Sequence, residues 1–318
     1  MAVTSVKEPA GRSDAPVTVT HAEVASPAQP TRAAVHRTVV PVPRSSSPVP
    51  TGRSAVRLVL ADVDGMEPFS PSFSADGHSL YFHAGRANGR LMRAELSPDG
   101  AVERVQSLLA DGASNFHVVP SPDGTAVAFD SDREGVRAVY VADSDGGHVR
   151  RVSGAGFAAV PTWSPDGTRL AFVKTDSNPR TWNVWVADAS TGALQQVSRH
   201  RVGQAWGASW FPDGDRLAYS REDQLVIANL MTGRQTTIRS PRQGHLVRTP
   251  SVSPDGARVV FQVQGDGVWV LDVAHERISR VLTDRSAEEF RWSPDGRRIA
   301  YHARHGQRWG VWTLGATS

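Results

Sequence analysis

Hydrophobic and polar residues alternate over short runs along most of the chain. The run Arg169-Leu170-Ala171-Phe172 is one example, and such alternation is typical of a half-buried β-strand. Each of six such runs follows a turn sequence related to Ser-Pro-Asp-Gly, in which proline and glycine favour a tight reversal. A tryptophan precedes three of these turns, at Trp163, Trp210 and Trp292. Because no stretch between the runs has the apolar spacing of an amphipathic helix, the pattern predicts an all-β fold.

The strand–turn–strand unit recurs at a regular interval. The turn aspartates of the six copies are Asp76, Asp123, Asp166, Asp213, Asp255 and Asp295. The intervals between them are 47, 43, 47, 42 and 40 residues, the length of one four-stranded propeller blade. A third strand such as Asn183–Asp188 and a fourth such as Leu194–Ser198 follow the unit. The chain is therefore predicted to form a six-bladed β-propeller.

The sixth repeat ends at its third strand, Trp309–Leu314, without a fourth. The segment Val56–Ala61 precedes the first repeat at the spacing that a fourth strand would have. We expect this N-terminal strand to complete the last blade, because the closed ring would then have no unpaired sheet edge at its seam.

Residues 1–54 differ from the rest of the chain in composition. They contain eight of the 21 prolines and no Phe, Trp or Tyr. Such a segment cannot bury enough apolar surface to offset the entropy of ordering its backbone, so we predict a disordered tail before a propeller at residues 55–318. If the tail binds a partner, the run Val39–Arg44 is its expected docking element, in extended or polyproline II form.

The net charge of +3 resides in the same segment. Residues 1–54 carry six Lys+Arg and three Asp+Glu, whereas residues 55–318 carry 29 of each sign. Because the predicted propeller is balanced, we expect no nucleic-acid partner. The absence of cysteine excludes disulfides, thiolate metal sites and a thiol nucleophile. No secretory signal and no 18-residue apolar run is visible, so we expect a cytoplasmic protein with no membrane span.

The repeat motif W-S-P-D-G-x-x-[LIV]-A-[FY] is fullest at Trp163–Phe172 and Trp292–Tyr301. It resembles the WD40-like repeat of TolB-type β-propellers, and the resemblance covers about residues 55–318. It implies a six-bladed propeller for which partner binding is one precedent. Oligogalacturonate lyases carry similar repeats and use histidines and a metal. The serine peptidases that carry them are a poor match here, because no G-x-S-x-G motif is present.

In a propeller, the connections that enter the first strand and leave the second strand of each blade lie on one face, around the central channel. Four histidines at such positions are candidate catalytic residues: His83, His302, His117 and His245. Six further residues are candidates for ligand binding: Trp206, Arg248, Glu288, Arg291, Arg86 and His305. The aspartates and tryptophans of the repeat motif are expected to be structural, since they recur in several blades.

His83 and His302 occupy equivalent repeat positions in blades one and six, which are neighbours in a closed ring. One of them could act as a general base and the other as an acid or a metal ligand.

Two classes of function remain open. In the first, the propeller binds a protein partner or a small polar ligand on the loops around the channel. In the second, it is an enzyme of lyase or isomerase type that uses acid–base or metal-assisted chemistry in a biosynthetic pathway. No cofactor fingerprint is evident, the histidines are compatible with a divalent metal, and we expect a monomer.

Overall fold

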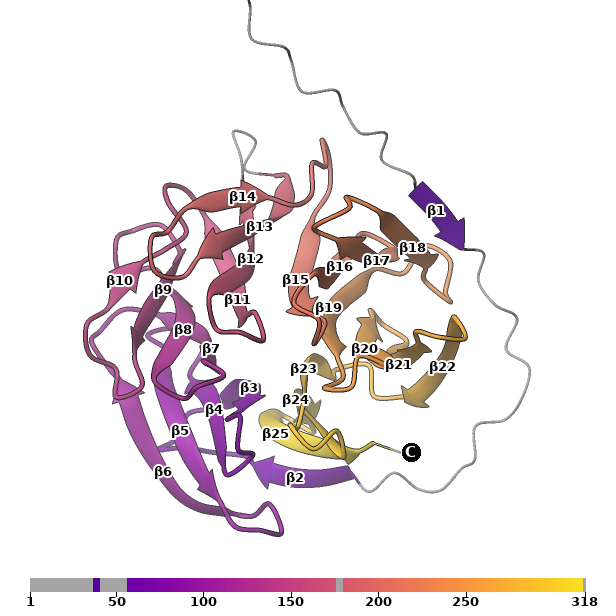
Figure 1. The fold of residues 1–318 in the computed structure, drawn as a ribbon. Helices are drawn as coiled ribbons and strands as arrows, with labels where there is room; N and C mark the ends of the chain where they lie inside the picture. The colour runs from indigo at the N-terminus through magenta and orange to yellow at the C-terminus, as the bar shows by residue number, and fades with distance from the viewer. Residues whose placement is uncertain (1–36, 41–55, 176–179, 317–318) are drawn as a thin grey trace, which may run out of the picture. The chain divides into compact units, whose positions relative to one another are not determined.

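The computed structural model describes residues 37–40, 56–175 and 180–316. Within these ranges, every element named as a helix or strand is a β-strand. Six sheets surround a central axis, each with four antiparallel strands and with the first strand of each repeat innermost (Figure 1); a fifth, parallel strand extends one of them. The predicted all-β, six-bladed propeller is thus confirmed. Among the described residues there is no helix of the length and apolarity that crossing a membrane requires.

The first three blades follow one another along the chain, each with its strands in sequence order. Blade one contains β3 (Pro68–Phe73), β4 (Ser79–Ala84), β5 (Arg90–Leu96) and β6 (Val102–Leu109). Blade two contains β7 (Asn115–Pro120), β8 (Ala126–Ser131), β9 (Ala138–Asp143) and β10 (Arg150–Arg151). Blade three contains β11 (Ala158–Trp163), β12 (Arg169–Thr175), β13 (Trp182–Asp188) and β14 (Leu194–Gln196).

The remaining blades complete the ring. Blade four contains β15 (Ala205–Trp210), β16 (Arg216–Arg221), β17 (Gln224–Asn229) and β18 (Gln235–Arg239). Blade five contains β19 (Val247–Val252), β20 (Arg258–Val263), β21 (Gly267–Asp272) and β22 (Arg277–Leu282). Blade six contains β23 (Glu288–Trp292), β24 (Arg298–His305), β25 (Arg308–Gly315) and the N-terminal strand β2 (Val56–Leu60).

The strand β2 closes the ring as the sequence predicted. It pairs antiparallel with β25, with Val56 opposite Leu314 and Leu60 opposite Val311. Gly310 lies against it, and a Cβ at that position would lie 3.0 Å from the carbonyl oxygen of Leu60. A glycine therefore permits the close approach of the two chain ends at the seam.

The Ser-Pro-Asp-Gly turns are held by their own side chains. In blade two, the Ser121 hydroxyl donates to Asp123, and the same Asp123 oxygen accepts from the Thr125 amide at 3.1 Å. The Ser121 hydroxyl oxygen in turn accepts from the Ala126 amide at 3.0 Å. These bonds, led by the one from Ser121, hold the pKa of Asp123 below its usual value. The repeat aspartates are thus structural, as expected.

The hydrophobic core lies between adjacent blades. The last aromatic position of the repeat motif is fully buried in all six blades, at Phe82, Phe129, Phe172, Tyr219, Phe261 and Tyr301. Burial of each such ring stabilises the fold by about 2 kcal/mol. Three repeat tryptophans also connect blades: the indole N–H groups of Trp163, Trp210 and Trp292 donate to the carbonyl oxygens of Val119, Thr162 and Ser251 in the preceding blade.

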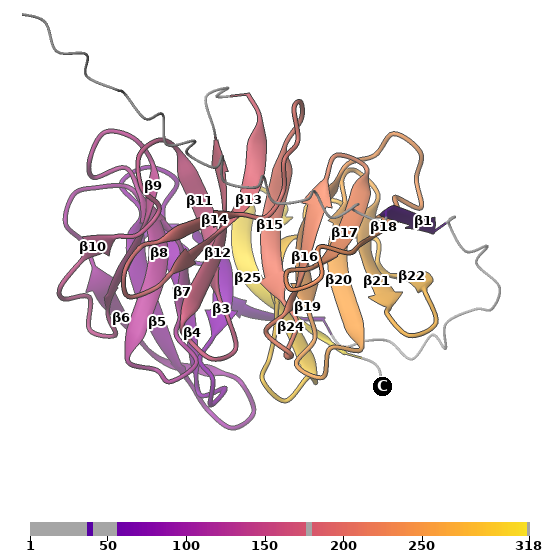
Figure 2. The same ribbon diagram turned by 45° about the horizontal axis from the view of Figure 1, so that its top comes forward.

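A short strand from the predicted tail, β1 (Arg37–Val40), extends blade four. It pairs in parallel with β18, with Arg37 opposite Gln235 and Val40 opposite Ile238, on the outer edge of the blade (Figures 1 and 2). Val39 and Val40 of the expected docking element lie in this strand. Residues 41–44 lie outside the described residues, as does the rest of the predicted tail.

Candidate functional site

The innermost strand of every blade contains a bulge at the same repeat position. The residue six positions before the turn aspartate has a positive φ in all six blades, at Ser70, His117, Val160, Gly207, Thr249 and Glu289 (the bulge ring). The strand register also shifts next to each of these residues. Only Gly207 adopts this conformation freely, since a left-handed conformation costs other residues about 1–2 kcal/mol each.

A second recurring position supports this strained ring. In three blades, the residue seven positions after the turn aspartate, near the end of the second strand, accepts the backbone N–H of the next blade's bulge residue. His302 Nδ1 accepts from Ser70 at 3.2 Å, His83 Nδ1 from His117 at 3.4 Å, and Asp130 Oδ1 from Val160 at 3.0 Å. The equivalence of His83 and His302 seen in the sequence therefore has a structural meaning: both connect their blade to the next one.

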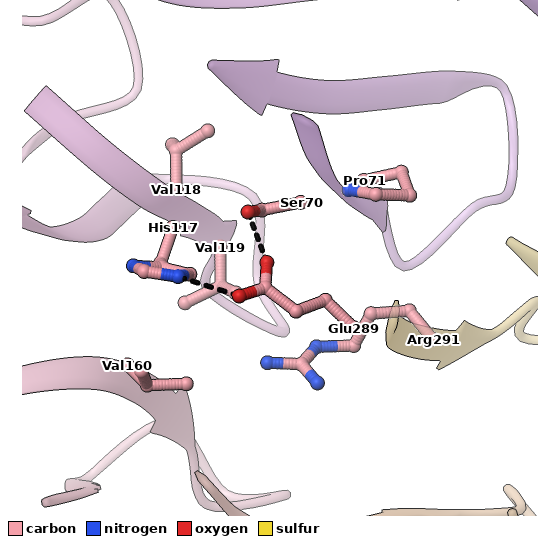
Figure 3. A pocket seen from close by; sticks show the side chains of 8 residues that line it. All are labelled: Ser70, Pro71, His117, Val118, Val119, Val160, Glu289 and Arg291. Atoms are coloured by element: carbon pink, nitrogen blue, oxygen red, sulfur yellow. Dashed lines mark hydrogen bonds and ion pairs between the residues drawn. The ribbon is translucent and has the colours of Figure 1, made fainter. Parts of the chain in front are cut away.

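The side chain of His117 joins two carboxylates, the fully buried Asp130 and the partly buried Glu289. Its Nδ1 lies 2.8 Å from Asp130 Oδ1 in the same blade. Its Nε2 lies 2.8 Å from Glu289 Oε1 of blade six (Figure 3). The Ser70 hydroxyl donates to the other oxygen of Glu289, and Arg137 pairs with the other oxygen of Asp130. Blades six, one and two are thus connected by one network of side chains.

The charge state of His117 follows from these partners. Burial alone would lower its pKa, but Glu289 and Asp130 outweigh burial and raise the pKa to about 9. Both ring nitrogens therefore donate, so the 2.9 Å approach of Arg137 to Nδ1 is not a hydrogen bond. Burial likewise opposes the charged forms of the carboxylates, yet His117 holds the pKa of Glu289 well below its usual value, and Arg137 and His117 lower that of Asp130.

His83 and His302 are neutral. Burial lowers the pKa of His83 to about 3 and that of His302 to about 4. Because each accepts a backbone N–H through Nδ1, the ring proton is on Nε2. The ring of Phe69 lies between them, stacked on His83 at 5.5 Å and edge-on to His302 at 5.4 Å between ring centroids.

These pKa values predict that the free energy of unfolding is greatest near pH 6.5. Below that pH the unfolded state takes up protons on His83 and His302, while the folded state does not until pH 3–4, so stability falls as the pH drops. Above it, the unfolded state loses the His117 proton that the folded state retains to about pH 9, so stability falls as the pH rises, by an amount on the order of 3 kcal/mol.

Urea unfolding between pH 5 and pH 9.5 would test this profile, because that range avoids the titration of unfolded carboxylates. His117→Gln should flatten the alkaline limb, and His83→Gln should reduce the slope between pH 5 and 6.5. A profile without an alkaline limb in the native protein would contradict the assigned charge of His117.

A small cavity lies at the bulge ring, with room for about one water molecule. Eight residues line it (Figure 3): Ser70, Pro71, His117, Val118, Val119, Val160, Glu289 and Arg291. The candidate ligand residue Arg291 is thus below the channel mouth, where its side chain donates to the Phe290 carbonyl oxygen at 3.0 Å. Burial lowers the pKa of Arg291.

The residues directly before the bulge ring form the next layer toward the loops. They are Phe69, Phe116, Ala159, Trp206, Arg248 and Glu288, so three predicted ligand residues share one repeat position. The Glu288 side chain is 38% exposed, and its carboxylate lies 3.9 Å from His302 Nε2. The pKa of Glu288 is raised, first by partial burial and then by the negative charge of Glu289. Trp206 lies within β15, so the expectation from the sequence that it lies in a connection is wrong.

Arg86 lies at the mouth beside blades one and six. Its guanidinium is 5.0 Å from the centre of the Phe69 ring and 5.2 Å from that of Trp309, and its Nε lies 3.6 Å from Glu67. Glu67 also accepts the Trp309 backbone N–H at 3.0 Å.

Two of the predicted histidines stand apart from the others. His245 is exposed, and its Nδ1 hydrogen-bonds the Gln264 carbonyl oxygen at 2.8 Å in blade five. His305 is exposed at the end of β24, with its ring centroid 4.1 Å from that of Trp312. In the part of the chain that the structure describes, no three His, Asp or Glu side chains are placed to hold a metal ion.

Sequence reasoning did not single out Phe69, Ser70, Arg137, Trp182 or Trp309. The first two could have been found by aligning the repeats position by position, since Ser70 aligns with His117 and Glu289. The other three lie on third strands or just before them and show no repeat signal.

Comparison with known proteins decides the family. The model for the TolB β-propeller domain matches residues 49–223, more than half of the chain. The chain belongs to the TolB β-propeller family. This membership supports a binding or scaffold role in general for the propeller.

Individual relatives of this TolB-family propeller cover only parts of it. Uncharacterized protein Atu1656 of Agrobacterium fabrum is 33% identical over 33% of the chain and 39% of its own length. The Tol-Pal system protein TolB of Francisella tularensis is 26% identical over 57% of the chain and 43% of its own length. The chain thus matches about two fifths of the length of these relatives.

Solved structures share the fold at low sequence identity. A putative TolB from Agrobacterium tumefaciens superposes with a TM-score of 0.61 at 18% identity, covering 80% of this chain and 92% of that one. An oligogalacturonate lyase in complex with manganese superposes with a TM-score of 0.58 at 15% identity, covering 81% and 79%. At these identities the comparison establishes the fold and nothing more.

Proposed function

We propose that this propeller binds a partner protein on the face that carries the channel mouth, which we call the loop face. The observation that supports the proposal most directly is the set of partly exposed aromatic and arginine side chains at the mouth, including Trp206, Arg248, Trp309 and Arg86. Tryptophan and arginine are the residue types that most often dominate the energetics of protein interfaces. The family relationship agrees with a binding role.

Catalysis of lyase or isomerase type is the alternative, and the fold shared with the manganese-bound oligogalacturonate lyase is the observation in its favour. The histidines argue against it. His83 and His302 use Nδ1 to accept backbone N–H groups, and His117 is held charged between two carboxylates. None of the three has a free basic nitrogen near neutral pH, which a general base requires.

The proposal can be tested by comparing the two faces of the propeller. One variant, Trp206→Ala with Trp309→Ala, alters both sides of the loop-face mouth. A control, His78→Ala with Arg297→Ala, alters exposed residues beside the Ser-Pro-Asp-Gly turns on the opposite face. Proteins captured by the native chain would be purified and titrated against both variants by calorimetry. We expect the loop-face variant to weaken binding by about tenfold or more and the control to leave it unchanged. Loss of binding in the control alone would refute the proposal.

A further inference from the structure

Three aromatic rings form a continuous surface on the loop face of blades three and four. Phe157, in the connection that enters β11, lies 4.9 Å from Trp182, and Trp182 lies 4.6 Å from Trp206 between ring centroids. All three side chains are partly exposed. We call these residues the aromatic platform; they lie in blades three and four, whereas the His117 network joins blades six, one and two.

The indole groups of the platform differ from those of the repeat motif. Trp163, Trp210 and Trp292 each use their N–H to hold a carbonyl oxygen of the preceding blade. The N–H groups of Trp182 and Trp206 make no hydrogen bond to any residue that the structure describes. The tryptophans of the repeat motif therefore use their N–H groups to stabilise the fold. The N–H groups of Trp182 and Trp206 are available to a ligand.

Arg248 borders the platform. Its guanidinium carbon lies 4.4 Å from the centre of the Trp206 ring, and its buried Nε has no hydrogen-bond partner among the described residues. A buried donor without an acceptor is costly, and an incoming carboxylate or carbonyl oxygen would satisfy the guanidinium.

The arginines of this side of the mouth also lack carboxylate partners. Within the described ranges, no Asp or Glu oxygen lies within 4 Å of the side-chain nitrogens of Arg199, Arg201, Arg221 or Arg248. On the side of blades one and two, by contrast, three arginines near the mouth are ion-paired: Arg86 with Glu67, Arg133 with Asp111, and Arg137 with Asp130. The platform thus lies in the half of the mouth where these four arginines make no close ion pair, and the charge of Arg248 acts on the Glu288 carboxylate only at longer range.

The connection between β14 and β15 adds an apolar residue to this half. Val202 is 74% exposed, between Arg201 and Gly203. The connection is fixed beside the platform, because the Trp182 amide donates to the Gly203 carbonyl oxygen at 3.1 Å and the Thr181 hydroxyl donates to that of Arg201 at 3.2 Å. An exposed apolar side chain next to unpaired arginines fits a partner that is both acidic and partly apolar.

We propose that the aromatic platform and Arg248 bind an acidic peptide segment of a partner protein that carries an aromatic side chain. The aromatic ring stacks on Trp206 and Trp182, while flanking Asp or Glu side chains pair with Arg248 and Arg201. The inference rests on the proposed binding function and assigns it to one half of the loop face. Ring stacking and a charge-assisted hydrogen bond would then act on the same residue pair, Trp206 and Arg248. Tryptophan and arginine side chains of this kind contribute much of the binding free energy in many interfaces.

Selection from a phage library of random dodecapeptides on the immobilised full chain tests the chemistry of the ligand. We expect the enriched peptides to combine Asp or Glu with Phe, Tyr or Trp. Enrichment of basic peptides, or of acidic peptides without aromatic residues, would overturn the proposal.

Fluorescence polarisation with an enriched peptide then tests the location. The chain offers a matched control on the opposite face, since Arg216 lies over the Phe211 ring beside a Pro-Asp-Gly turn as Arg248 lies over Trp206. We expect Trp206→Leu and Arg248→Gln each to weaken binding about tenfold, and Arg216→Gln to change it less than about twofold. Trp309→Leu and Arg86→Gln probe the other half of the loop face, where Arg86 lies over Trp309. Unchanged thermal unfolding of each variant would separate loss of binding from loss of folding.

The outcomes also distinguish this inference from the proposal on which it rests. If only Trp309→Leu and Arg86→Gln weaken binding, the loop face is the binding face and the platform is not the site. If all four loop-face variants bind as the native chain does, or if no peptide is enriched, both the platform and the peptide-binding function are refuted.

Discussion

Replacing His117 by leucine is expected to cost about 3–5 kcal/mol of unfolding free energy. The substitution would leave the Glu289 carboxylate, whose side chain is 20% exposed, with only the Ser70 hydroxyl as a hydrogen-bond donor. It would also remove one of two cations beside the fully buried Asp130. An uncompensated charge in a largely buried site is among the most destabilising defects of a folded protein. Urea unfolding at pH 6.5, where the network contributes fully, would measure the loss.

An exposed pair within the same chain provides the control. His148 lies 2.6 Å from Asp143, but its side chain is 89% exposed, so His148→Leu should leave the unfolding midpoint unchanged. The double variant His117→Gln with Glu289→Gln should be more stable than His117→Leu, because it removes the negative charge of Glu289 together with the positive charge of His117 that compensates it. A loss below about 1 kcal/mol in His117→Leu would mean that water reaches both carboxylates.

Removing the closing strand should have the second large effect. A chain that begins at residue 62 lacks β2, so it exposes the edge of β25 and uncovers the apolar contacts of Val59 and Leu60 with blades one and six. We expect its thermal midpoint to fall by about 10 °C, since roughly 3 kcal/mol or more is lost from a domain of this size. We also expect aggregation through the open edge.

A chain that begins at residue 55 is the matched control, because it keeps β2 and loses only the residues before it. Its thermal midpoint, compared with that of the full chain, reports what β1 contributes at the edge of blade four. If the chains that begin at residues 55 and 62 melt at the same temperature, β2 does not hold the ring closed.

The repeat carried most of the information about the fold. The turn aspartates marked each blade, and the missing fourth strand of the last repeat pointed to the closing segment Val56–Ala61. Both features depend on local sequence, namely turn residues and alternation, which are visible without knowledge of distant contacts. The strand β1 was not predicted as part of a blade, because its four residues carry no repeat motif.

The candidate site was predictable in location and not in detail. Sequence position placed His83, His117 and His302 on one face, and the structure brings them together around Phe69 and Glu289. The contact of His117 with Glu289 joins residues 172 positions apart and depends on left-handed bulges. Val160 and Thr249 belong to residue types that avoid this conformation, so their identities conceal the bulges.

The six blades have the same strand arrangement, but the hydrogen bonds that join neighbouring blades at the bulge ring differ from blade to blade. Side chains of blades six, one and two each hold the backbone of the next blade through His302, His83 and Asp130. The equivalent Val173 of blade three has no polar atom to do so, and the equivalent Ser220 of blade four bonds Trp206 of its own blade. Blades three and four are joined instead by the Trp210 indole, which donates to the Thr162 carbonyl oxygen, and blades four and five by the Ser209 hydroxyl, which accepts the Val252 amide at 3.0 Å. The bonds made by His302, His83 and Asp130 therefore depend on pH, whereas these bonds beside the aromatic platform involve no titrating group.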